Sequence, residues 1–304
     1  MSQTPELHVH TSLPETYGSR GLQHQAMRIQ RIPRLKRKSA LLLWQLSLVL
    51  LLVPLLCESS HAQTLYQRSI AKLNDRAGKA APDDYTFVVM GDSRNGEKKF
   101  KQALRLARSY DPLFILHGGD YSDKGGEEET ARFLLVLNQS VPDIPLFVVI
   151  GNHENCKVFE KKVGPSNFTL SSKRLGFKLI ALNNADDALR APEQDLLRRE
   201  LASASGAVFV AMHVPPRTKR WPGHSFTRGA DDLEKILAGS RVQALFLSHS
   251  HVYDRSEFGG VPAFITGGAG APLPWFPSYG ERVHHILVVR VKNGKASCRM
   301  VPLP

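Results

Sequence analysis

The eight residues 147–154, FVVIGNHE, join a short apolar run to a group of polar side chains. Such a run ending in glycine is typical of a buried strand, here Leu146–Ile150. The same layout occurs earlier, where Thr86–Met90 precedes Gly-Asp and Leu113–Leu116 precedes His-Gly-Gly-Asp. Between these runs, apolar residues at helical spacing predict helices at 98–110 and 130–138. Strands that alternate with helices predict βαβ units in a largely parallel sheet.

The second half of the chain continues the pattern with fewer helices. Further strands are predicted at Phe168–Leu170, Phe177–Leu182, Val208–Met212, Ala244–Leu247, Ala263–Ile265 and Ile286–Val291. A helix is predicted at Pro192–Ala204, because proline is favoured in the first turn. Glycine-rich turns join the later strands, so we expect a second, mixed sheet. Residues 85–304 are therefore predicted to form one α/β domain, and residues 63–84 a linker or short helix before it.

Polar residues whose side chains can bind a metal ion follow several of these strands. They are Asp92, Asp120, Asn152, His213, His249 and His251. The carboxyl ends of strands in open α/β sheets are where ligands bind, so we expect these side chains to converge. Carboxylate and imidazole ligands suit Zn, Fe or Mn, and one carboxylate can bridge two metals about 3.5–4 Å apart. The pattern predicts a two-metal site for hydrolysing phosphate esters.

The segments that carry these residues resemble the signature blocks of calcineurin-like metallophosphoesterases, from about Thr86 to Ala271. Residues 151–154 match the Gly-Asn-His-Glu block of that family. Residues 249–255, HSHVYDR, and residues 264–270, FITGGAG, are closest to the purple acid phosphatase-like branch, with Ser248 replacing a glycine of its pattern. The resemblance implies a four-layer αββα sandwich of two mixed sheets flanked by helices.

The resemblance also implies a role for each residue. Asp120 corresponds to the carboxylate that bridges two divalent or trivalent metal ions, and a hydroxide activated by both metals corresponds to the nucleophile. Asp92 and His251 correspond to ligands of the first metal, and Asn152, His213 and His249 to ligands of the second. His153 corresponds to the residue beside the scissile ester that hydrogen-bonds the phosphate and protonates the leaving group.

One position departs from the family pattern. Many members carry a histidine ligand of the first metal where this chain has Arg94, and a guanidinium cannot donate a lone pair to a metal. Purple acid phosphatases supply a tyrosine three residues after the bridging aspartate, where this chain has Asp123, while Tyr121 directly follows Asp120. Either Asp123 or Tyr121 completes the first site, or that site binds its metal weakly. Arg94 is predicted either to grip the substrate phosphate or to pair with a carboxylate.

The first 62 residues have the layout of a leader. Residues 1–27 are polar and predicted to be disordered, and a basic cluster at 28–38 precedes the apolar run Ala40–Leu56. Small residues at Ser60 and Ala62 fit a cleavage site before Gln63. Residues 28–62 are therefore predicted to be a signal peptide or an uncleaved signal anchor. Both place the domain outside the cytoplasm, as a periplasmic or secreted protein or one anchored in the membrane by residues 40–56.

Composition narrows the choice of function. The formal charge of +12 suits an anionic substrate, but the chain lacks the basic stripe and clustered aromatics of a stable nucleic-acid partner. The sequence favours an enzyme that hydrolyses phosphate monoesters. One alternative is a phosphodiesterase acting on nucleotides or lipid head groups. The other is a catalytically weak phosphate-binding protein, in which the first metal is not bound because Arg94 replaces a histidine ligand.

Two further features stay open from sequence. Pro215–Ser225 contains three cations, Trp221 and His224, and forms either a basic, aromatic rim for substrate or a solvated loop. Cys156 and Cys298 are free to pair in an oxidising compartment, although two cysteines do not make a disulfide framework.

Overall fold

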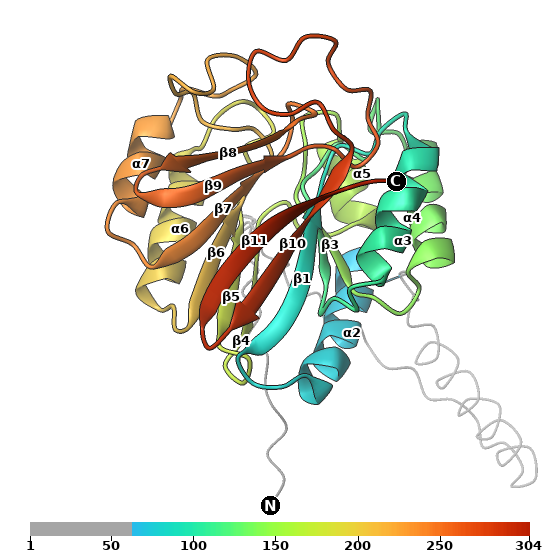
Figure 1. Ribbon diagram of the computed structural model, residues 1–304, viewed down its shortest axis with the longest axis horizontal. Coiled ribbons are helices and arrows are strands. Elements are labelled where there is room, and N and C mark those ends of the chain that lie inside the picture. The colour runs from blue at the N-terminus through green and yellow to red at the C-terminus, as the bar shows by residue number, and fades with distance from the viewer. Residues whose placement is uncertain (1–62) are drawn as a thin grey trace, which may run out of the picture. The chain divides into compact units, whose positions relative to one another are not determined.

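A computed structural model describes residues 63–304, in which two β-sheets lie face to face between outer helices (Figure 1). The predicted leader, residues 1–62, lies outside the described residues. Within residues 63–304, no helix combines the length and apolar character needed to cross a bilayer.

The first sheet has the strand order β11-β10-β1-β2-β3. Its parallel part consists of β1 (Asp84–Met90), β2 (Ile115–His117) and β3 (Leu146–Val148). Two antiparallel strands, β10 (His285–Lys292) and β11 (Lys295–Pro302), extend it beside β1. Because β1 and β2 are neighbours and parallel, the residues that follow them emerge at the same edge.

The second sheet has the order β4-β5-β6-β7-β9-β8. Its strands are β4 (Phe168–Ser172), β5 (Phe177–Ala181), β6 (Ala207–Ala211), β7 (Val242–Leu247), β8 (Tyr253–Phe258) and β9 (Val261–Thr266). The run from β5 to β9 is parallel, and β4 and β8 close its two edges in the antiparallel direction.

Helices cover the outer face of each sheet (Figure 1). They are α3 (Glu97–Arg108), α4 (Glu127–Ser140) and α5 (Cys156–Lys162) on the first sheet, and α6 (Ala191–Ala202) and α7 (Ala230–Leu237) on the second. The predicted α/β class and four-layer αββα arrangement are confirmed.

The alternation of side chains along β1 explains why the layers stack in this order. Phe87 and Val89 point into the core between the sheets, while Val88 and Met90 pack against the helices outside. Phe87 meets Phe209 on β6 edge to face, with ring centroids 5.1 Å apart. A strand that is buried on both faces must be apolar throughout, which is why its sequence reads as a continuous run.

The segment at residues 63–84 is not a linker. Most of it forms α2 (Leu65–Lys79), which begins with a capping box between Thr64 and Gln67. Ser69 donates its hydroxyl to the carbonyl of Leu146 at 2.8 Å, and Leu73 is fully buried in the core between the sheets. The mostly polar composition of this helix concealed its narrow apolar face. Of the two alternatives, a linker or a short helix, the structure contains a helix that packs into the core.

Every predicted strand and helix is present, with ends shifted by no more than three residues. The sequence did not predict α5, α7, β8 or β11. Both β8 and β11 are edge strands with charged side chains, a composition that protects sheet edges but hides a strand pattern. Cys156 and Cys298 lie on α5 and β11 and are both free among residues 63–304, so the pairing that the sequence left open is not present there.

If α2 belongs to the folding unit, Leu73→Ala will lower the free energy of unfolding by about 2–5 kcal/mol, because it leaves a cavity in the core. Asn74→Ala, at the next and exposed position of the same helix, serves as the control and will change it by less than about 0.5 kcal/mol. Urea unfolding curves measure both. Equal midpoints for the two variants would restore the linker interpretation.

Candidate metal centre

The six predicted ligands lie together at the carboxyl ends of strands from both sheets. Asp92 follows β1, Asp120 follows β2, Asn152 follows β3, His213 follows β6, and His249 and His251 follow β7. Their donor atoms form two groups, each within 4.8 Å: Asp120 with His213 and His249, and Asp92 with Asp120 and His251. Asp120 belongs to both groups, which is the position that a bridging carboxylate needs.

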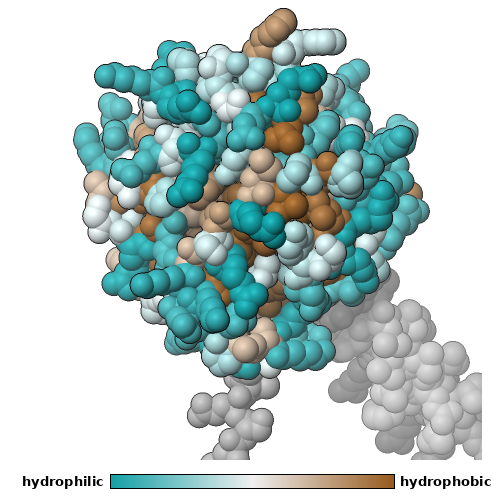
Figure 2. Space-filling model, in the orientation of Figure 1, coloured by the Kyte–Doolittle hydropathy of each residue, from teal (hydrophilic) through white to brown (hydrophobic). Residues whose placement is uncertain are grey.

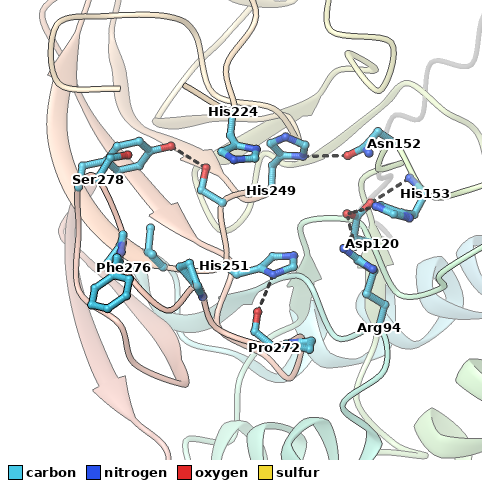
Figure 3. Close-up of a pocket in the computed structure, with 15 residues that line it drawn as sticks. Arg94, Asp120, Asn152, His153, His224, His249, His251, Pro272, Phe276 and Ser278 are labelled. Atoms are coloured by element: carbon cyan, nitrogen blue, oxygen red, sulfur yellow. Dashed lines mark hydrogen bonds and ion pairs between the residues drawn. The ribbon is translucent and has the colours of Figure 1, made fainter. Parts of the chain in front are cut away.

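The imidazoles on the Asp120 side face the amide of Asn152. Its Oδ1 lies 3.0 Å from His213 Nε2. The same oxygen lies 2.8 Å from His249 Nδ1 (Figure 3). His213 Nε2 is also 3.4 Å from Asp120 Oδ1. Several nitrogen and oxygen atoms that could bind a metal therefore face one small volume from four strands.

Hydrogen bonds on the far side of each ring set its tautomer. His213 Nδ1–H donates to the carbonyl of Gly118 at 2.7 Å, and His251 Nδ1–H donates to that of Pro272 at 2.9 Å. Both rings therefore present Nε2, and that of His251 lies 3.6 Å from Asp92 Oδ1. A carbonyl on the second nitrogen is the usual support for a metal-binding histidine.

Burial at the centre fits the binding of cations. Asp92 and Asp120 are 0% and 1% exposed, and Asp92 Oδ1 has no hydrogen-bond partner within residues 63–304. Burial, reinforced by the neighbouring Asp120, raises the pKa of Asp92 well above its usual range. A buried carboxylate without a partner is costly, and a bound cation supplies that partner. The donor set therefore fits divalent metal ions.

His213 balances part of this charge in the metal-free protein. Burial lowers its pKa, but Asp120 outweighs burial, and the pKa of His213 rises to about 9. In turn, burial alone opposes the ionisation of Asp120, and the charge and hydrogen bond of His213 overcome it and lower the pKa of Asp120. The positive charge of His213 thus stabilises the negative charge of Asp120.

Four of the six ligands have a left-handed backbone that non-glycine residues rarely adopt. The φ angles are 58° at Asp92, 57° at Asp120, 72° at His249 and 52° at His251. Such conformations persist where the surroundings over-determine them, and they cluster at functional sites. Here, for example, the amide of His249 donates to Asp92 Oδ2 at 2.9 Å.

Two supporting residues were not assigned roles from the sequence. Glu154 accepts backbone N–H groups of Asp120 and Gly151, each at 2.8 Å, and so fixes the turn that carries Asp120. His117 is fully buried, and burial lowers its pKa to about 3, so its ring is neutral. Its Nδ1 accepts from the amide of Gly119 at 3.2 Å, which leaves Nε2–H to donate to Ser93 Oγ at 3.0 Å.

Neither candidate for the missing first-site ligand reaches the centre freely. The hydroxyl of Tyr121 lies 3.2 Å from Thr130 Oγ1, and its ring stacks on Phe133 in the core beside α4. Asp123 pairs with Arg94, whose Nη1 is 2.5 Å from Asp123 Oδ1. The carboxylate alternative for Arg94 is therefore the arrangement that the structure contains, although Arg94 also lines the pocket.

A pocket of about 430 Å³ opens over the centre. Asp120, Asn152, His249 and His251 border it, and His153 lies beside Asp120 with its Nε2 3.9 Å from Asp120 Oδ2 (Figure 3). His224 also lines this pocket, and its ring lies 5.8 Å from that of His249.

Trp221 does not belong to an aromatic rim at this pocket. It is fully buried and donates its indole N–H to Asp254 at 2.7 Å. Arg220 binds the same carboxylate, so the predicted rim loop is instead tied to β8. Of the two ring side chains in residues 215–225, Trp221 and His224, only His224 borders the pocket.

Residues 85–253, more than half of the chain, match the family described as calcineurin-like phosphoesterase. The chain belongs to this family. It is a family of hydrolases acting on phosphoester bonds, and the two overlapping ligand groups suit the two metal ions of its dimetal members.

The relatives of this phosphoesterase are distant. A probable cyclic nucleotide phosphodiesterase of Fibrobacter succinogenes is 23% identical over 156 residues, which are 49% of this chain and 59% of that protein. A purple acid phosphatase from yellow lupin seeds has a TM-score of 0.59 at 14% identity, over 72% of this chain and 52% of its own. A dimetal phosphatase from Danio rerio has a TM-score of 0.57 at 11% identity, over 73% of this chain and 97% of that protein. At these identities the structures show a shared fold.

Ser248, which replaces a glycine of the family pattern, is accommodated by two other glycines of this phosphoesterase. A Cβ atom on Gly91 or Gly118 would lie 2.3 Å or 2.0 Å from Ser248 Oγ. The hydroxyl is fully buried and has no hydrogen-bond partner among the described residues. The substitution is therefore sterically possible but leaves a polar atom unsatisfied.

Ser248→Ala is expected to raise the free energy of unfolding by about 1 kcal/mol, since it removes an unsatisfied buried hydroxyl. Ser93→Ala is the matched control: its hydroxyl is also buried but bonds His117, so its loss will lower stability by a similar amount. Denaturant titration of both variants measures the difference, and a destabilised Ser248→Ala variant would contradict this account.

The wild-type protein is expected to bind about two metal ions per chain, by elemental analysis after dialysis. Asp120→Ala, which removes the shared ligand, will leave close to none, while His251→Ala will retain about one. Tyr121→Phe is the control and will keep the wild-type content, because that hydroxyl bonds Thr130. Retention of both metals by Asp120→Ala would refute the bridging position.

Proposed function

We propose that this protein is a metal-dependent hydrolase of phosphate esters, with monoesters as its preferred substrates. The observation that carries the proposal is the pair of donor groups that share the buried Asp120 and border a pocket. Two metals bound there supply an activated water and neutralise charge on the phosphoryl oxygens. The five residues of these groups, with Asn152 beside them, are the ligands that the family resemblance implies.

The side chains beside Asp120 provide the remaining chemistry. Arg94 lines the pocket with its Nε 3.8 Å from Asp120 Oδ2, so its guanidinium supplies positive charge where a phosphate would bind. His153 Nδ1–H donates to the carbonyl of Asp123 at 2.8 Å, which fixes the ring. When protonated, His153 Nε2–H faces the pocket and delivers its proton to the leaving oxygen.

The monoester preference rests on charge. A monoester dianion carries one more negative charge than a diester, and Arg94 and His153 lie together on one side of the pocket (Figure 3). The second candidate is a phosphodiesterase, which the name of the Fibrobacter relative favours. The third, a weakly catalytic phosphate-binding protein, would follow if the Arg94–Asp123 pair prevents binding of the first metal.

We also propose that the domain acts outside the cytoplasm. The basic cluster and apolar run before Ser60-His61-Ala62 support this. Amino-terminal sequencing of protein from each cell fraction tests it, since export with cleavage predicts a start at Gln63.

Hydrolysis of p-nitrophenyl phosphate and of its bis ester tests the activity, with Mn²⁺, Zn²⁺ or Fe²⁺ and with a chelator. We expect metal-dependent turnover, faster for the monoester. His153→Ala will lower kcat by about 10²–10⁴-fold with the metals retained, because it removes the proton donor. His284→Ala, a histidine outside the pocket, will have little effect.

A faster rate with the bis ester would favour the diesterase. The absence of turnover from a protein that holds its metals would favour the binding protein.

A further inference from the structure

The loop between β9 and β10 forms the wall of the pocket that faces the phosphate-binding side. In Figure 3, Phe276 and Ser278 lie on one side of the pocket, and Arg94, Asp120 and His153 lie on the other. The loop contributes Pro272, Pro274, Phe276, Pro277 and Tyr279 to the lining, so that wall is largely apolar.

The loop is fixed at both ends to the turn that carries the metal ligands. His251 donates to the carbonyl of Pro272, and the hydroxyl of Tyr279 lies 2.7 Å from Ser250 Oγ. Between these anchors, Pro274 and Pro277 restrict the backbone, which lowers the entropy lost when a ligand binds. The middle of the loop is therefore held beside the pocket.

The two aromatic residues at the middle of the loop are exposed. Trp275 is 83% and Phe276 is 93% exposed, and the other large exposed apolar side chain among residues 63–304 is Leu135, on α4. The face in Figure 2 is mostly hydrophilic, and an apolar side chain projects where this loop lies in Figure 1. Adjacent exposed aromatics beside a polar cleft are typical of a ligand-binding surface.

We infer that Phe276, with Trp275 beside it, forms a subsite for a planar aromatic leaving group, so that aryl or nucleoside phosphates are preferred over alkyl phosphates. This rests on the proposed function. The two sides of the pocket match the two ends of such an ester: Arg94 and His153 face the anionic phosphate, and the apolar wall faces the ring. Aromatic side chains bind planar rings by stacking without requiring one particular base.

The kinetic test compares phenyl phosphate with ethyl phosphate, and adenosine 5′-monophosphate with ribose 5-phosphate. Using the full chain with Mn²⁺, we expect Phe276→Ala to lower kcat/KM about tenfold for the two aromatic esters, mainly through KM, and less than about twofold for the other two. Leu135→Ala, which truncates an exposed apolar side chain away from the pocket, is the control and will change none of them. A loss for only one aromatic ester identifies the ring type that the subsite takes.

A binding test does not depend on turnover. Calorimetry with phenylphosphonate and methylphosphonate is expected to show tighter binding of the phenyl compound, a preference lost in the Trp275→Ala/Phe276→Ala double variant but kept in Leu135→Ala. If no ester is hydrolysed and this preference is found, the proposed function fails and the subsite stands. If esters are hydrolysed but the wild type shows no phenyl preference, or the double variant keeps it, the subsite is refuted and the function stands.

Discussion

The close burial of Asp92 and Asp120 is the constraint on which the rest of this structure depends. Two carboxylates with almost no solvent exposure repel each other, and in the metal-free protein His213 is the main positive charge beside them. Asp120 comes from the first sheet and His213 from the second. The two sheets must therefore pack face to face for the charges to meet, so the aromatic core between the sheets also holds the site together.

The turns that carry the candidate ligands have backbone conformations that are unfavourable for non-glycine residues. Left-handed backbone at four ligands costs about 1–3 kcal/mol each, and hydrogen bonds such as those from Asp120 and Gly151 to Glu154 hold the turns in place. Only glycine fits at positions 91 and 118, because a side chain there would collide with Ser248. The candidate ligands are thus held together by the turns around them, which would limit the rearrangement that metal binding requires.

The fold, and the convergence of the candidate ligands at one edge, could be predicted because both follow from strand ends. Apolar runs such as Thr86–Met90 locate the sheet edge, and polar residues just beyond them must converge there. Side-chain direction within the turns could not be predicted in this way. Tyr121 is adjacent to Asp120 but points into the core beside α4, and Trp221 is buried by a bond to Asp254, 33 residues later. Those partners depend on packing between distant segments, which strand and helix periodicity does not encode.

The turn at residues 249–251 carries two candidate metal ligands and also hydrogen-bonds the loop that forms the apolar wall of the pocket. His249 and His251 supply ligands, while Ser250 between them and the far nitrogen of His251 hold the β9–β10 loop. The hydrogen bond to Pro272 fixes both the tautomer of His251 and the position of the apolar wall. A change in the loop that displaced Pro272 would therefore also disturb Nε2 of His251, since second-shell hydrogen bonds orient metal ligands. The loop is thus constrained at its two ends, while its exposed middle, with Trp275 and Phe276, lies between these two hydrogen bonds. Under the proposed function, changes in the middle of the loop alter substrate preference and leave the candidate ligands in place.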